Sequence, residues 1–321
     1  MNDNKQLRIL SCGEVLWDII HDQEHIGGAP FNLAAHLAQL GCDARMLTRI
    51  GDDPRGKAAL AEMGRLGVYC SLVKIDPDHP TGYARVNLSG DGVASYTFPP
   101  NPAYNFIEAD DGLIRSLAAA DFDAICFGTL QQKGDRTRAS LMRVPRDVPA
   151  RQVFFDINIR MKFYPAEVLR ESLSLSTIVK LNEDEVPRVA QRLYDQAMPE
   201  PELAARLSRD FPIRIVCITK GPAGCIVFRG NESQTIPIES PVKVADTVGA
   251  GDAFSAALLQ HYCKTGDPFA SARHGNLLGA YVASKTGAVP AYDSAILKNL
   301  QQALFGQPVC PYALFRFQNE G

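Results

Sequence analysis

Short apolar runs alternate with helical patterns along most of the chain, and this alternation limits the folds that it can adopt. The runs expected to form buried strands lie at residues 7–13, 46–50, 123–127, 152–156, 177–181 and 214–219. Successive strand–helix units imply right-handed crossovers and a parallel sheet covered by helices on both faces. No linker interrupts the pattern, so the sequence predicts one layered α/β domain over residues 1–321.

Helical patterns fill the intervals. A helix is expected after residue 29 with Gly41 as its stop, and others at residues 57–66, 113–119, 136–142, 167–175, 183–193, 201–208, 252–264, 268–284 and 294–304.

The pattern changes in one region, where two alternating segments flank a Ser-Gly-Asp-Gly turn. Residues 81–88 and 93–98 read as a hairpin around that turn, and the prolines at 99–102 break regular structure behind it. A two-stranded piece is marginally stable alone, so we expect a small antiparallel flap that covers a ligand. This lid is expected mainly from residues 72–106, with part of 15–26. Residues 225–228 and 233–238 form a second expected hairpin.

Composition excludes several classes of protein. The net charge of −3 and pI near 6.1 leave no basic footprint for nucleic acid. No run approaches the ~18 apolar residues of a membrane span, and the polar N-terminus lacks a signal-peptide pattern. The eight cysteines form no C-x-x-C pair, which favours free thiols, and no histidine spacing suggests zinc. The sequence therefore predicts a cytoplasmic protein.

Residues 244–254 contain two glycines, Gly249 and Gly251, followed by Asp252 and a small, apolar helical pattern. Residues 241–244 before them read as a short strand. A strand, glycine turn and helix N-terminus together favour an anion, because the first amides of a helix lack partners. Asp252 beside such a pocket could take a proton from an attacking hydroxyl in phosphoryl transfer. The alternative is an ordinary turn with a first-turn carboxylate.

Polar residues also follow several expected strands. They lie at Glu14 and Asp18, at residues 156–160, at Asn182 and Glu185, and at residues 219–221. Each is usually a solvated loop alone, but the carboxyl ends of parallel strands share one crevice. Carboxylate and amide oxygens there suit Mg²⁺, and Arg160 or Lys220 could meet phosphates. A P-loop is absent, and the glycine turn lacks the third glycine of a dinucleotide fingerprint.

Two stretches resemble the signatures of one family. Residues 246–254 (DTVGAGDAF) resemble the C-terminal signature of the ribokinase-like (PfkB) sugar kinases, and residues 27–32 with Gly41 and Gly51-Asp52 resemble their N-terminal signature. Residues 13–18, 127–130, 156–160 and 282–290 are similar to the fructokinase branch. The resemblance covers nearly the whole chain. It implies a ribokinase-like three-layer α/β/α fold with a small antiparallel β lid.

The resemblance implies a role for each matching residue. Asp252 would be the catalytic base, beside an anion hole made by the amides of Gly249, Ala250 and Gly251. The sugar would be held by Asp18, Gly28, Asn32, Phe98 and Arg160. The nucleotide would be bound by Asn182, Glu185, Thr219, Gly221, Gly224 and Asn276.

The same resemblance implies ATP and Mg²⁺, with Glu185 organising the metal through water. K⁺ would bind near Asp246 and Val248. At Lys220 many relatives carry a smaller or uncharged residue, and its role stays open.

The implied activity is phosphorylation of D-fructose to fructose 6-phosphate by a homodimer paired through the lid. Ribose, tagatose, 2-keto-3-deoxygluconate or a nucleoside are alternative acceptors. A silent sugar-binding regulator would retain Asp18 and Asn32 but lack the base and the anion hole, and both are present here.

Overall fold

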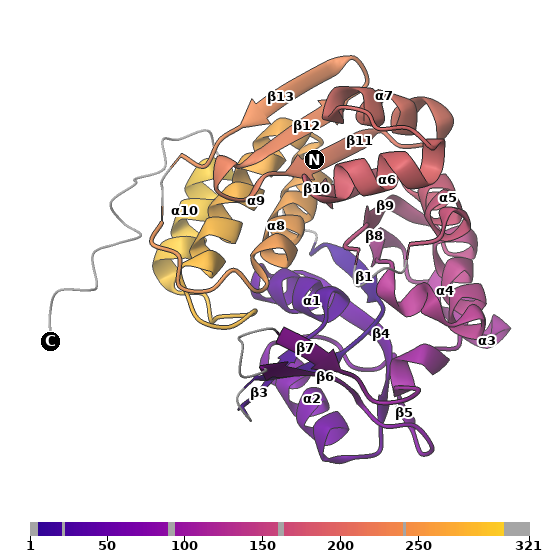
Figure 1. The fold of residues 1–321 in the computed structure, drawn as a ribbon. Coiled ribbons are helices and arrows are strands. Elements are labelled where there is room, and N and C mark those ends of the chain that lie inside the picture. The colour runs from indigo at the N-terminus through magenta and orange to yellow at the C-terminus, as the bar shows by residue number, and fades with distance from the viewer. Residues whose placement is uncertain (1–5, 21–22, 89–93, 160–163, 240–241, 305–321) are drawn as a thin grey trace, which may run out of the picture.

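In the described part of the chain, nine strands form one sheet that runs through the molecule between helices (Figure 1). The structure is a computed structural model, and it describes residues 6–20, 23–88, 94–159, 164–239 and 242–304. The strand order is β13-β12-β11-β10-β9-β8-β1-β4-β5. The bounds are β1 (Arg8–Cys12), β4 (Asp43–Gly51), β5 (Val73–Asp76), β8 (Phe122–Phe127), β9 (Ala150–Asp156), β10 (Ile178–Asn182), β11 (Ile215–Thr219), β12 (Cys225–Arg229) and β13 (Glu232–Ile236).

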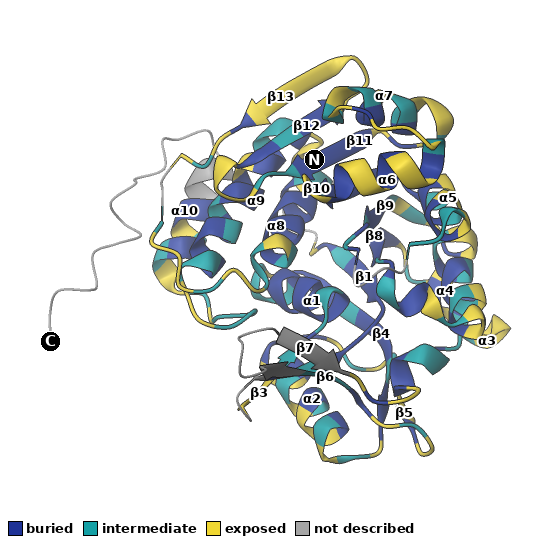
Figure 2. Cartoon of the chain, in the orientation of Figure 1, coloured by how far each residue is buried: buried dark blue, intermediate teal, exposed yellow. Residues whose placement is uncertain are grey.

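The seven neighbouring strands β5, β4, β1, β8, β9, β10 and β11 of this sheet pair in parallel. β12 and β13 continue the sheet in antiparallel fashion. The predicted parallel sheet and the predicted second hairpin are therefore confirmed. Every residue of β8 is buried, which is what a strand covered on both faces requires. At the edge, β13 carries exposed residues (Figure 2).

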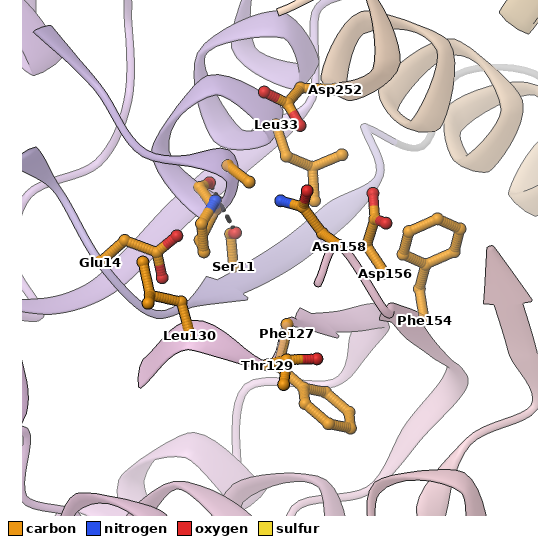
Figure 3. A pocket seen from close by; sticks show the side chains of 13 residues that line it. Ser11, Glu14, Leu33, Phe127, Thr129, Leu130, Phe154, Asp156, Asn158 and Asp252 are labelled. Atoms are coloured by element: carbon orange, nitrogen blue, oxygen red, sulfur yellow. Dashed lines mark hydrogen bonds between the residues drawn. The ribbon is translucent and has the colours of Figure 1, made fainter. Parts of the chain in front are cut away.

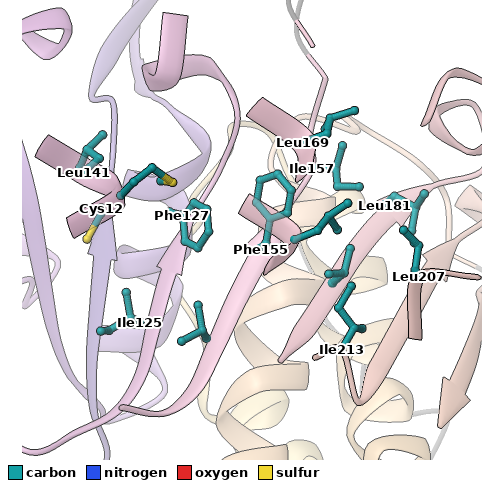
Figure 4. Close-up of a cluster of buried hydrophobic side chains, with 14 of the residues drawn as sticks. Cys12, Ile125, Phe127, Leu141, Phe155, Ile157, Leu169, Leu181, Leu207 and Ile213 are labelled. Atoms are coloured by element: carbon teal, nitrogen blue, oxygen red, sulfur yellow. The ribbon is translucent and has the colours of Figure 1, made fainter. Parts of the chain in front are cut away.

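Helices cover both faces of the sheet. Ile125 and Phe127 of β8 pack with helices α3 to α7, and Figure 4 shows this cluster with Phe155 and Leu181 of neighbouring strands. The alternate residues, Ala124 and Cys126, pack with α1, α8 and α9. The helices are α1 (Ala29–Gln39), α2 (Pro54–Arg65), α3 (Asp111–Ala118), α4 (Asp135–Asp147), α5 (Ala166–Leu175), α6 (Glu185–Tyr194), α7 (Glu200–Asp210), α8 (Ala250–Thr265), α9 (Pro268–Ala283) and α10 (Ser294–Leu304). Because successive strand residues face opposite helical layers, the three-layer architecture follows from the period of two.

A second, smaller sheet lies beside the first. Its order is β3 (Gln23–Gly27), β2 (Leu16–Ile20), β6 (Gly82–Leu88) and β7 (Ala94–Thr97). β6 and β7 pair in antiparallel fashion, as the sequence predicts, and the turn between them lies outside the described residues. β2 pairs with β6 in parallel, however, so the sheet is mixed. Val73–Asp76, which the sequence groups with the lid, pairs with β4 and extends the main sheet.

One predicted strand is wrong. Residues 242–249 form a loop rather than the extended run expected before the glycine turn. The Ala245 amide donates to the Ala283 carbonyl at the end of α9, at 2.9 Å, and the Val244 side chain is 57% exposed. The loop therefore pairs with a helix end rather than with a strand.

Candidate active site

No described side chain accepts a hydrogen bond from the first amides of helix α8. Its N-cap, Gly249, has a left-handed φ of 77°, and a Cβ there would lie 2.3 Å from the Ala288 carbonyl oxygen. Only glycine meets both constraints. The Ala250 amide makes a long bond of 3.3 Å to the Thr247 carbonyl. Since a first helical turn has amides without intrahelical partners and the positive end of the dipole, this N-terminus can bind an anion.

Asp252 lies in the first turn of α8, next to a residue from the other end of the sequence. The Asn32 side-chain amide of α1 donates to Asp252 Oδ2 at 2.8 Å. Asn32 is buried, and its Oδ1 atom has no hydrogen-bond partner in the described part of the chain. Helix α1 starts after Gly28, whose φ of 107° places it where a Cβ would lie 2.6 Å from the Glu14 carbonyl oxygen. The fold thus brings three of the predicted residues into one place.

A cavity opens beside this pair. Figure 3 shows Asp252 of α8 on one side, Asp156 at the end of β9 with Asn158 beyond it, and Glu14 after β1. Asn158 has a left-handed φ of 39°, a conformation that asparagine adopts more readily than most residues other than glycine. Carboxylates from three separate elements therefore line a single cavity at the carboxyl edge of the sheet.

Asn182 and Glu185 fasten the junction between β10 and α6. The Asn182 amide donates to Glu185 Oε2 at 2.8 Å, and the Glu185 amide donates back to Asn182 Oδ1 at 3.0 Å. The Ile159 amide donates to Glu185 Oε1 at 2.6 Å. Burial of the Glu185 carboxyl raises its pKa. This acid therefore joins two strand ends through backbone amides.

The predicted nucleotide residues surround the end of β11. Thr219 ends the strand, and Gly221 follows with a φ of 51°. Gly224 has a φ of 89°, and a Cβ there would lie 2.1 Å from the Ile236 carbonyl oxygen. The turn therefore requires glycine at 224, and the left-handed φ at 221 favours glycine there.

Two further side chains near this turn already have protein partners. Asn276 of α9 is buried, and its side-chain amide donates to the Ile236 carbonyl at 2.8 Å. Lys220 forms an ion pair with Glu200 at 2.9 Å. The structure gives Lys220 a partner without assigning it a ligand.

The loop before α8 is tied to the segment that follows α9. The Val248 amide donates to Asp246 Oδ1 at 3.0 Å, and the Gly287 amide donates to Asp246 Oδ2 at 3.2 Å. The Asp246 carboxylate thus holds two backbone segments together.

Three residues predicted to bind the sugar lie in the small sheet, directly after it, or outside the described chain. Asp18 is within β2, not in a loop beyond β1, and a Cβ at Gly27 of β3 would lie 2.8 Å from its Oδ2 atom. Phe98 directly follows β7 and is exposed. Arg160 lies outside the described residues.

The chain matches the profile of the pfkB family carbohydrate kinases over residues 6–295. It belongs to that family. A fructokinase from Escherichia coli is 31% identical over 247 residues, which cover 75% of this chain and 78% of that one. A Vibrio cholerae fructokinase solved with fructose, ADP and calcium has a TM-score of 0.78 at 23% identity, covering 91% and 98% of the two chains. A Salmonella enterica aminoimidazole riboside kinase, solved with its riboside and an ATP analogue, has a TM-score of 0.76 at 21% identity, covering 92% and 99%.

This carbohydrate kinase therefore has the ribokinase-like fold, a mostly parallel sheet between helical layers with a small second sheet. No helix among its described residues has the length and apolar character needed to cross a membrane. The same residues contain no cluster of three or more His, Cys, Asp and Glu side chains that could hold a metal ion.

The sequence interpretation missed Lys180 in this kinase. Lys180 lies inside β10, is buried, and pairs with Asp156 at 3.0 Å. The signal was present in the sequence, because a lysine interrupts the apolar run at residues 177–181. A charge within a buried strand requires a partner, and that partner is often functional.

Proposed function

We propose that this carbohydrate kinase transfers the γ-phosphoryl group of ATP to the primary hydroxyl of D-fructose, giving fructose 6-phosphate. The observation that carries the proposal is the bond between Asn32 and Asp252 at the open N-terminus of α8. It puts a polar group suited to sugar hydroxyls, a carboxylate and a helical anion site within one contact distance.

In the proposed reaction, the sugar hydroxyl attacks the γ-phosphorus in line. Asp252 accepts the hydroxyl proton while the new oxygen–phosphorus bond forms. The bond between the γ-phosphorus and the β,γ-bridging oxygen breaks, and its electron pair leaves on ADP. The amides of Gly249, Ala250 and Gly251 donate to the oxygens of the transferring group, whose charge is largest in the transition state.

Asp18, Gly28, Asn32, Phe98 and Arg160 are proposed to hold the sugar. The small sheet would act as a lid that excludes water, which would otherwise compete as the acceptor. Asn182, Glu185, Thr219, Gly221, Gly224 and Asn276 are proposed to position the nucleotide.

The oxygen-rich donor set at the strand ends fits Mg²⁺, which binds through few carboxylates and keeps several waters. Since both Glu185 oxygens already accept backbone amides, Glu185 is proposed to act through water. When bound, the metal would neutralise charge on the phosphates. The carbonyls of Asp246 and Val248 are proposed to hold K⁺.

We also propose that the chain acts as one domain in the cytoplasm. Pairing of two lids into a homodimer would cover the edges of the small sheet.

A riboside is the second candidate acceptor. The likeness to the aminoimidazole riboside kinase covers 92% of this chain with a TM-score of 0.76, close to that of the fructokinase. Hydroxyl stereochemistry depends on small differences in pocket shape, which a common fold does not fix.

An ATP-consumption screen tests the proposal. It compares fructose, ribose, tagatose, 2-keto-3-deoxygluconate and nucleosides at matched concentrations, with Mg²⁺ and with or without K⁺. We expect the highest kcat/KM with fructose and a product phosphorylated at the primary hydroxyl. A higher kcat/KM with a riboside would replace fructose by the second candidate. If none of the acceptors is phosphorylated, the proposal is contradicted.

A further inference from the structure

Lys180 has a position that neither strand packing nor solubility explains. It is 7% exposed, and its neighbours Val179 and Leu181 belong to the buried core. Taking an ammonium out of water is unfavourable unless it meets an opposite charge. A lysine at this point in β10 therefore needs a reason that an apolar residue could not supply.

The ammonium reaches the carboxylate that lines the active-site cavity. Lys180 Nζ lies 3.0 Å from Asp156 Oδ2 and 3.2 Å from Asp156 Oδ1. Asp156 is one of the residues that line the cavity with Asp252 (Figure 3). The ion pair thus connects the interior of the sheet with the site.

The same ammonium lies against the first turn of α8. A Cβ built on Gly251 would lie 3.4 Å from Lys180 Nζ, so the Gly251 backbone passes directly beside the charge. Ser255, one turn later, places its hydroxyl 2.9 Å from the Gly251 carbonyl and 3.2 Å from Asp156 Oδ2. β10, the end of β9 and the anion-binding turn therefore meet around one positive charge.

The surrounding charges are negative. Burial acts to lower the pKa of Lys180, but the carboxylates of Asp156, Glu185 and Asp252 outweigh it and raise the pKa overall. The lysine therefore keeps its charge at neutral pH. Three carboxylates would otherwise repel a polyphosphate, and the charge on the transferring group grows during reaction.

We propose that Lys180 is a positioning residue for phosphoryl transfer, whose ammonium offsets the negative charge that accumulates over Gly249–Gly251 in the transition state. This inference rests on the proposed function. A fixed positive charge in a site shielded from water stabilises developing negative charge without reorganisation, and the effect is realised in the transition state rather than in sugar binding. Lys180 would therefore act on kcat more than on KM for the sugar.

The competing explanation is that Lys180 only neutralises Asp156. The two explanations predict different results when Asp156 is uncharged. If Lys180 only neutralises Asp156, its removal should then have no effect on kcat. A cycle of Lys180→Met, Asp156→Asn and the double variant separates them. Arg138→Met is the matched control, because it removes a cation from a partly buried ion pair with Glu171 that lies away from the site, between α4 and α5.

In the cycle, kcat, the sugar KM and the urea midpoint are measured for each protein. We expect Lys180→Met to lower kcat about 10²-fold both in the wild-type background and in the Asp156→Asn background, with the sugar KM changed by less than about 3-fold. The double variant should regain a urea midpoint near that of Asp156→Asn without regaining kcat. Equal kcat for the double variant and Asp156→Asn would overturn the proposal, as would a kcat loss of similar size in Arg138→Met. If Lys180→Met does not fold, the comparison of Asp156→Asn with the double variant decides the question.

A binding measurement provides a readout independent of turnover. The affinity for ADP is measured by calorimetry with sugar and Mg²⁺, with and without aluminium fluoride, which imitates the transferring phosphoryl group. Lys180→Met should lose about 10²-fold in the affinity gained from aluminium fluoride while ADP alone binds as before. An unchanged gain would overturn the role of Lys180 and leave the proposed function standing. Wild-type protein that turns over no acceptor would instead overturn the proposed function, and this inference with it.

Discussion

The N-termini of α6 and α8 differ in the hydrogen-bond partners of their backbone amides. At the start of α6, side-chain oxygens of Asn182 and Glu185 accept hydrogen bonds from the amides of that junction. At the start of α8, no described side chain caps the helix, and Gly249 holds the turn in a left-handed conformation. At one junction side chains accept from the backbone amides, and at the other no described side chain does so.

This difference suggests that the α6 junction serves stability and the α8 junction serves turnover. A junction whose hydrogen bonds are satisfied within the protein resists movement, so Glu185 is suited to hold β9, β10 and α6 in register. An uncapped junction carries positive potential that an anion can use. We therefore expect changes at α8 to affect turnover first, and changes at α6 to affect stability first.

The largest effect is expected at Asp252. Asp252→Asn keeps an oxygen that can accept from Asn32, so the contact between α1 and α8 can survive. The variant cannot accept the hydroxyl proton, and kcat should fall by at least ~10². Turnover is measured by coupled ADP release, and sugar affinity by calorimetry. Near-normal turnover would show that Asp252 is not the base and would remove the contrast between the two junctions.

Next in size is the contrast between the two glycines of the α8 turn. Gly249→Ala must place a Cβ 2.3 Å from the Ala288 carbonyl oxygen at a φ of 77°, so the turn has to rearrange. We expect kcat to fall at least ~10-fold and the unfolding free energy to fall by about 1–3 kcal/mol. Gly251→Ala is the matched control, since its Cβ would meet only Lys180 Nζ at 3.4 Å, an ordinary contact distance. Its loss of kcat should be smaller, and its stability should be close to that of the wild type. Equal losses in both variants would mean that steric bulk near the phosphoryl group matters, rather than the geometry of the turn.

Much of this fold could be predicted from periodicity. The run at residues 177–181 is found as Ile178–Asn182, and the run at 123–127 as Phe122–Phe127, because strands buried on both faces are continuous apolar segments. The segment predicted as a strand at 241–244 also contains two valines, but Val244 is exposed and the described residues 242–244 are a loop. Apolar side chains therefore indicate a strand only where a neighbouring strand can accept its hydrogen bonds.

The site was predicted less completely. Asn32 and Asp252 were both expected at a sugar, but their direct contact joins residues 220 positions apart, which no local pattern encodes. Lys180 was passed over because its partner, Asp156, is 24 residues earlier in the chain. The parallel pairing of β2 with β6 was missed for the same reason, since pairing between distant segments is decided by the folded sheet.

A smaller effect on turnover is expected at the closed junction. In Glu185→Gln, the side-chain NH₂ must face one of the two backbone amides that now donate to the carboxylate, so one bond is lost in a buried place. We expect the unfolding free energy to fall by about 1–3 kcal/mol, with a kcat loss below that of Gly249→Ala and a higher Mg²⁺ requirement. Urea unfolding and Mg²⁺ titration of activity measure these changes. Glu183→Gln, an exposed neighbour in the same turn, is the control. A loss of kcat as large as that of Asp252→Asn, with stability unchanged, would assign Glu185 to the chemistry instead.

The smallest expected effect is a pH dependence of the unfolding free energy, which differs between the histidines of α1 and α8 and Glu185 at the α6 junction. Burial lowers the pKa of His36 on α1 to about 3 and that of His261 on α8 to about 4. Both values lie below the ~6.5 of an unfolded histidine, so the unfolded chain takes up protons that the folded chain cannot. Unfolding free energy should therefore be little affected by these groups above about pH 6.5, and should fall by about 1 kcal/mol per histidine between about pH 6.5 and 5.5.

The contribution of Glu185 to stability changes with pH in the opposite direction to that of the two histidines. Its raised pKa lets the folded state bind a proton before the unfolded state does, so acid stabilises the α6 junction while it destabilises the helices that carry Asn32 and Asp252. Urea unfolding at about pH 7.5, 6.5 and 5.5 measures the slope, and His261→Asn should have a shallower slope than the wild type whatever its absolute stability. An unchanged slope in that variant would mean that His261, stacked on His274 at 3.9 Å, does not couple α8 to pH. The contrast between the two junctions would then lie in their hydrogen bonds alone.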